Sequence, residues 1–159
     1  MLQSTAQILD LMIASFVFGG TVWFFFVQSP ALIKWMGRDK FVPIQMRLTK
    51  VLFKTLTIAL AAGVVMTILH GGFIASHALV SIVIAFLSVA INNFYVIPRA
   101  LKAGGKGRVE EKDQSDDKSF GKFASEGSGP SAKFWHRMVV LFVVLMLAGL
   151  VPHMITLLG

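Results

Sequence analysis

Charged side chains are absent from three long stretches of the chain, residues 11–33, 55–98 and 138–159. The middle stretch is interrupted by His70 and the two glycines that follow it, and a glycine pair of this kind marks a tight turn. About 20 apolar residues cross the hydrocarbon core of a bilayer as a helix, so the middle stretch has room for two spans and each of the others for one. The pattern predicts an all-α, antiparallel four-helix bundle that is integral to a membrane.

The four spans are expected at residues 8–33, 46–70, 74–98 and 135–157, within a single membrane domain that covers residues 1–159. A soluble helical protein is a poor alternative, because the last span has no polar face at any helical phase. Hydrophobic residues fill 55% of the chain, which leaves little material for a soluble domain.

The long polar segment at residues 102–133 is rich in glycine, serine and charged residues and poor in large apolar side chains. Such a composition buries too little apolar surface to fold alone. We therefore expect a flexible charged loop between the third and fourth spans.

All fifteen Lys and Arg residues lie in two blocks, at the connections between spans one and two and between spans three and four. In a four-span protein these two connections share a side of the membrane. The positive-inside rule then places the loops at residues 34–50 and 99–137 in the cytoplasm and both termini on the non-cytoplasmic side. The net charge of +7 is thereby explained as a topology signal, and no nucleic-acid partner is expected.

Three basic residues share one helical face at the start of the second span, at the spacing i, i+3, i+7: Arg47, Lys50 and Lys54. Long basic side chains at the end of a span reach back to the interface, where anionic lipid heads attract them. We expect this face to contact anionic lipids.

Small and polar residues follow one face of the third span from His77 to Tyr95 in steps of three or four. Small residues let membrane helices approach closely, so the stripe is interpreted as a helix-packing surface. A solute or proton path along the stripe is the alternative, although no ionisable residue lies at its centre. The expected packing set over three spans is Ser15, Gly19, Ala59, Ala62, Ser81, Ala85 and Ser88.

Three histidines, His70, His77 and His153, fall at the outer ends of spans two, three and four. If they converge, their imidazoles would suit a transition metal. The other interpretation is that they hydrogen-bond water and backbone, and because cysteine is absent and no span carries a closely spaced histidine pair, no cofactor is expected. Asp10 is the only acid in or near a span, and one carboxylate does not provide paired acid/base chemistry.

A second group of polar residues gathers at the cytoplasmic mouth of the expected bundle. This candidate polar site consists of His136, Arg137, Asn92, Asn93 and Tyr95. If the three outer histidines do not converge, this group is a better candidate for a binding site than they are. The sequence contains no phosphate loop, nucleophile elbow or catalytic dyad, so no catalytic residue is assigned.

Several short motifs occur in one order along most of the chain. The segment from Gly20 to Trp23 has the form G-x-x-W, Gln45 opens a segment of the form Q-x-x-L, and Asn93 and Pro98 precede the charged loop. Phe134 and His136 then begin the last span. Together these motifs resemble the transmembrane protein 205-like family. The resemblance implies a four-helix integral membrane protein with links to secretory-pathway membranes and metal-drug tolerance, and with no established catalytic residues.

The chain is more distantly similar to the anthrone-oxygenase-like membrane proteins, which also have four spans. Two function classes are therefore open. The first is a non-enzymatic membrane protein, either an accessory subunit or a bundle that handles a small solute or a metal, alone, as a homo-oligomer or in a larger membrane complex. The second is a small membrane oxygenase or redox protein that acts on a lipid-soluble substrate.

Overall fold

The computed structural model describes residues 2–71, 76–102 and 132–158, and all the elements in these ranges are helical. Two short π-helical segments, η1 and η2, interrupt the first and third spans, and residues 97–102 return to α-helix after η2. The elements are α1 (Leu2–Val22), η1 (Trp23–Gln28), α2 (Ser29–Met36), α3 (Arg38–Leu69), α4 (Ser76–Ile91), η2 (Asn92–Val96) and α6 (Ala132–Leu158).

Four of the helical stretches are long and apolar enough to cross a membrane: Thr5–Met36, Ile44–Leu69, His77–Lys102 and Phe134–Leu158. The prediction of an all-α four-helix membrane bundle is confirmed. The chain is a multi-pass integral membrane protein. Most of the predicted charged loop, residues 102–133, lies outside the described residues.

Glycines make the two sharp breaks next to α3. Gly37 has a φ of 75°, a backbone conformation that glycine adopts without strain, and it separates α2 from α3. Gly71 has a φ of 94° directly after the last turn of α3. Because α3 begins at Arg38, well before the expected start of the second span at residue 46, its first turns extend beyond the apolar stretch Ile44–Leu69.

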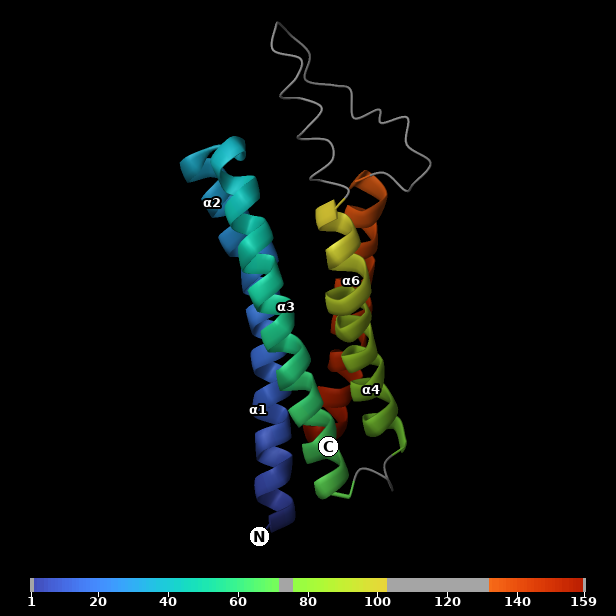
Figure 1. Cartoon of the computed structure of the whole chain (residues 1–159). Helices are drawn as coiled ribbons and strands as arrows, with labels where there is room; N and C mark the ends of the chain where they lie inside the picture. The colour runs from blue at the N-terminus through green and yellow to red at the C-terminus, as the bar shows by residue number, and fades with distance from the viewer. Residues whose placement is uncertain (1, 72–75, 103–131, 159) are drawn as a thin grey trace, which may run out of the picture.

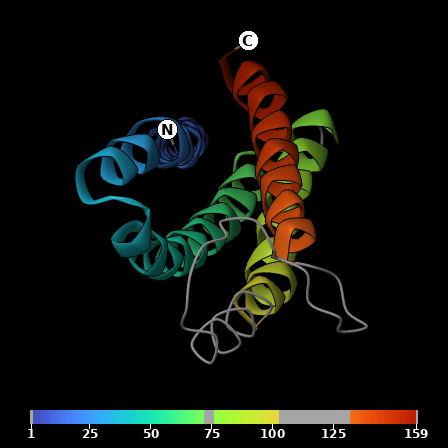
Figure 2. The same ribbon diagram turned by 90° about the horizontal axis from the view of Figure 1, so that it is seen from above.

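The helices associate as two antiparallel pairs, α1 with α3 and α4 with α6 (Figure 1). Both chain ends and the end of α3 lie at one end of the bundle, which we call the terminal end. The opposite end holds α2 and the start of α6, and we call it the basic end. The two pairs lie close together at the terminal end and diverge toward the basic end (Figures 1 and 2).

The core is apolar and continuous across the helices, with fully buried side chains that include Phe53, Leu60, Ile82 and Met146. Large apolar side chains also cover the outside of the bundle, as a lipid environment requires. Against this background, the buried polar residues stand out: Asp10, Thr21, Thr67, Ser88, Asn92 and His153.

Candidate functional site

Asp10 lies within the first membrane span and has no exposed surface. Its two carboxylate oxygens face side chains from α3 and α6, so one residue joins three helices. Gly63 lies beside the carboxylate: a Cβ atom there would lie 2.8 Å from Cδ1 of Ile82 and 3.6 Å from Oδ1 of Asp10. We call Asp10, Thr67, His70 and His153 the Asp10 cluster.

His153 binds Asp10 from α6, which continues through Pro152 to Leu158. Its Nε2 atom is 3.1 Å from Oδ1 of Asp10, and its Nδ1 atom donates to the backbone carbonyl of Ala78 on α4 at 3.0 Å. Both ring nitrogens are thus engaged and the side chain is fully buried. The imidazole orientation is fixed by two helices at once.

The other carboxylate oxygen of Asp10 faces α3. Thr67 donates its hydroxyl to Oδ2 at 2.6 Å and also lies 3.0 Å from the carbonyl of Gly63. Nε2 of His70 lies 3.0 Å from the same Oδ2. An O–H donor at 2.6 Å from a carboxyl oxygen is in the range of charge-assisted hydrogen bonds, which are stronger than neutral ones.

Accessibility changes across the Asp10 cluster. The side chain of His70 is 11% exposed, whereas those of Asp10 and His153 are 0% exposed. A buried carboxylate without partners would be very costly in an apolar medium, and two imidazoles with a hydroxyl supply the compensation. The arrangement can therefore hold charge and exchange it with the terminal end through His70.

The three histidines predicted as a metal set do not share one location. His70 and His153 meet at Asp10, while His77 is exposed. Among the residues that the structure describes, no group of three or more His, Cys, Asp or Glu side chains is arranged to hold a metal ion.

The predicted polar site at the basic end is divided between helices. Asn92 is buried and donates to the carbonyl of Val139 on α6 at 3.1 Å, whereas Asn93 donates to Thr57 on α3 at 3.3 Å. Tyr95, His136 and Arg137 are exposed. Tyr95 instead stacks under Arg99, whose Cζ lies 3.4 Å from the ring centroid.

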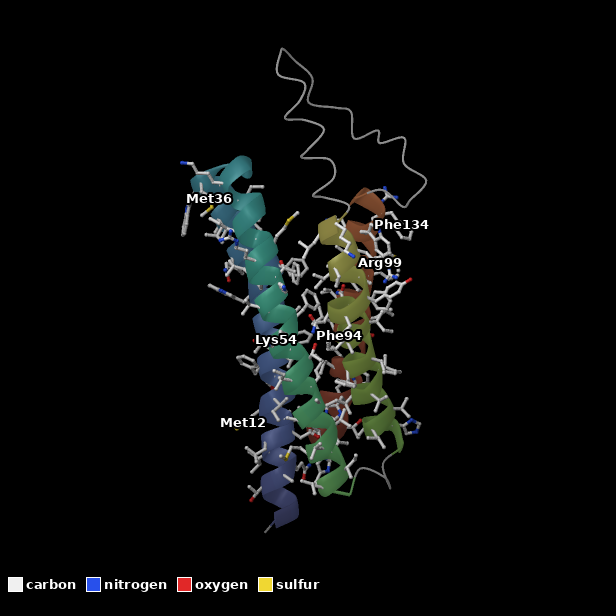
Figure 3. All side chains as sticks on the ribbon, viewed as in Figure 1. Met12, Met36, Lys54, Phe94, Arg99 and Phe134 are labelled. Carbon is white, nitrogen blue, oxygen red and sulfur yellow. The ribbon has the colours of Figure 1, made fainter. Side chains whose placement is uncertain are left out.

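The aromatic residues at the basic end form a cluster around Arg99. Its Cζ is also 5.9 Å from the ring of Trp135, which packs edge-on against Tyr95 and Phe134. Figure 3 shows Arg99 and Phe134 near the basic end of the bundle. The rings and the guanidinium form an amphipathic group of the kind found at membrane interfaces.

The predicted packing residues differ in burial. On α4, Ala85 and Ser88 are buried and Ser81 is half-buried. Ala59 and Ala62 of α3 are half-buried, whereas Ser15 and Gly19 of α1 are exposed. The predicted lipid-contacting residues Arg47, Lys50 and Lys54 are all exposed on α3.

Asp10 and Thr67 are the site residues that sequence reasoning missed. The signal was the position of Asp10, the only acid in or near a span. Its partners come from residues 67, 70 and 153, far away in the sequence, and no local spacing relates them.

Comparison with known proteins gives one family. The profile of a domain of unknown function, DUF4149, matches residues 12–108, which is more than half of the chain. The chain belongs to this family. The DUF4149 match includes Thr67 and His70, whereas Asp10 and His153 lie outside it. No curated protein and no solved structure matches the chain.

Proposed function

We propose that this protein is a non-enzymatic membrane bundle that handles a small cation at the Asp10 cluster. The observation that carries the proposal is a fully buried carboxylate within a membrane span, held by side chains from two other spans. Ionisable residues inside membrane helices are costly and typically mark ion or proton pathways. Helix packing by itself does not require a carboxylate, because small and hydroxyl side chains are sufficient for close contacts between membrane helices.

The entrance to this site is His70, the one partially exposed member of the Asp10 cluster. In the orientation that the positive-inside rule favours, the basic loops are cytoplasmic and the terminal end faces the other side of the membrane. The cation then enters from the non-cytoplasmic side. The exposed Arg47, Lys50 and Lys54 support anionic lipid contacts near the opposite interface.

The resemblance to the transmembrane protein 205-like family supports a cation-handling role, because it implies links to metal-drug tolerance. The oxygenase alternative would use the same carboxylate and imidazoles as a general base on a lipid-soluble substrate. Both classes place the chemistry at Asp10, so the experiment must read out ion movement itself.

The test uses protein reconstituted into sealed liposomes that contain either a pH-sensitive or a zinc-sensitive dye. The wild-type protein should dissipate a gradient of at least one of these cations faster than protein-free vesicles do. Asp10→Asn should remove this activity. Thr21→Val, a change at another fully buried polar residue of α1, should retain it.

Equal rates for wild-type and protein-free vesicles with both dyes would overturn the proposal. Retention of wild-type rates by Asp10→Asn would also overturn it. Oxygen-dependent turnover of a lipid-soluble aromatic compound by the purified protein would instead favour the oxygenase class.

A further inference from the structure

We infer that the cation of the Asp10 cluster is a proton, and that Asp10 and His153 share one proton which exchanges with the terminal end through His70. The inference rests on the proposed function and names its solute. It follows from the number of hydrogens that the observed contacts require.

The ring of His153 fixes one hydrogen position. Its Nδ1 atom is 3.0 Å from the carbonyl oxygen of Ala78, and a carbonyl oxygen only accepts hydrogen bonds. Nδ1 therefore carries hydrogen. A neutral imidazole has one N–H, so Nε2 would then be an acceptor.

Nε2 of His153 faces Oδ1 of Asp10 at 3.1 Å, and an ionised carboxylate is also only an acceptor. Two acceptors at this distance need a hydrogen between them. The pair must contain one proton more than a neutral imidazole and a carboxylate, placed either on Nε2 or on Oδ1. In both forms the pair has no net charge, which is the cheapest charge state in an apolar interior.

Oδ2 of Asp10 is the atom through which a proton can enter or leave. Nε2 of His70 lies 3.0 Å from it, and His70 is the member of the Asp10 cluster nearest to solvent. A proton bound by Nδ1 of His70 lets Nε2 pass its own hydrogen to Oδ2. The imidazole is neutral again after the transfer, and Oδ2 of Asp10 carries the proton. Rotation of the carboxyl group about its Cβ–Cγ bond exchanges the positions of its two oxygens and brings this proton to the side of His153.

The path ends at His153, because the carbonyl of Ala78 beyond it does not take up a proton under ordinary conditions. Among the described residues, the titratable side chains that face Asp10 are His70, directly after α3, and His153 from α6. The carbonyl of Ala78 on α4 contacts His153 and not Asp10. The site therefore loads and unloads at one end. Its proton also joins α1 to α6, and so one helix pair to the other.

The experiment determines protonation in the purified full-length protein. Nitrogen-15 NMR of labelled histidine reports whether both ring nitrogens of His153 carry hydrogen, and infrared spectroscopy detects a protonated carboxyl. Histidine ordinarily changes charge between about pH 5 and 8, so spectra are recorded across that range. Signals are assigned with His153→Gln and Asp10→Asn, and His136→Gln at the exposed basic end is the matched control.

At neutral pH we expect either a doubly protonated ring that disappears in His153→Gln or a carboxyl band that disappears in Asp10→Asn. His136→Gln should leave both signals unchanged. Should Asp10→Asn not fold, Thr67→Val keeps the carboxyl and both imidazoles and should shift the signal, because one donor to Oδ2 is lost.

A singly protonated His153 together with an ionised Asp10 at neutral pH would overturn the inference. If the same protein still moved zinc across liposome membranes in an Asp10-dependent way, the proposed function would remain valid, with zinc as the cation in place of the proton. A shared proton without cation movement would contradict the proposed function instead and leave the proton count correct.

Discussion

Asp10 shows how a single acidic residue is accommodated inside a membrane helix. Each carboxylate oxygen lies within hydrogen-bond distance of at least one side chain, with Nε2 of His153 at Oδ1, and Thr67 and His70 at Oδ2. When one partner is removed from a buried ionic network, the other polar groups lose a hydrogen bond that no water replaces. Even conservative substitutions in such a network are therefore destabilising.

Thr67→Val keeps the shape of the side chain and removes the hydroxyl that binds Oδ2. We expect a loss of about 1.5 to 3 kcal/mol in the free energy of unfolding, the range for hydrogen bonds to charged groups. The control is Thr21→Val, because the Thr21 hydroxyl is equally buried but bonds only the carbonyl of Val17 in its own helix. Chemical denaturation in detergent compares the two variants, and equal losses would show that the Thr67 contact has no special strength.

At the level of the helices, α4 and α6 approach each other closely at Gly149. A Cβ atom at this position would lie 2.8 Å from the carbonyl oxygen of Ser81 and 3.1 Å from the backbone nitrogen of Ala85. Both near neighbours are backbone atoms, which do not move aside as a flexible side chain would. Gly149 of α6 therefore packs directly against Ser81 and Ala85 of α4. This contact helps to bring His153 close to Ala78 and Asp10.

Gly149→Ala should separate α4 from α6 and cost about 1 to 3 kcal/mol of stability, as overpacking in a tight core does. Gly19→Ala is the matched control on α1, because its new Cβ would meet nothing within 4 Å. That variant should be neutral or slightly stabilising, since alanine favours a helix over glycine by about 1 kcal/mol. Apparent melting temperatures in detergent separate the two, and equal values would contradict the close approach.

Over the whole molecule, the two helix pairs meet at the terminal end, and α2, the start of α3 and the start of α6 lie at the other end (Figure 1). The distribution of Lys and Arg predicts that the basic end is cytoplasmic. The chain contains no cysteine, so single cysteines report topology without background. Lys40→Cys lies at the basic end and Leu158→Cys at the terminal end, and both positions are exposed.

In sealed cells, an impermeant thiol reagent should label Leu158→Cys at once and Lys40→Cys only after permeabilisation. The reverse pattern would invert the orientation and would make the entrance at His70 cytoplasmic. Equal labelling of both positions in sealed cells would contradict the four-span arrangement.

Charge-free stretches and glycine breaks were sufficient to predict the four helices, because the bilayer imposes length and apolarity on each span separately. The Asp10 cluster was not predictable in the same way. Its members come from three helices, and the sequence does not show the close approach of backbone atoms of α4 to Gly149 of α6. Of the stripe predicted on the third span, Ala85 and Ser88 of α4 are buried, whereas His77 at the start of α4 and Tyr95 in η2 are exposed.

The most direct test of the central claim, that Asp10 and His153 form one buried unit across the helix pairs, is a double-mutant cycle. Asp10→Asn, His153→Gln and the double variant are compared with the wild type by the free energy of unfolding in detergent. If the contact at 3.1 Å exists, the sum of the stability losses of the two single variants should exceed the loss of the double variant. The expected difference is about 0.5 to 3 kcal/mol, the coupling found for residues in one network. Additive losses within about 0.3 to 0.5 kcal/mol would show that the two side chains act independently and would contradict the Asp10 cluster.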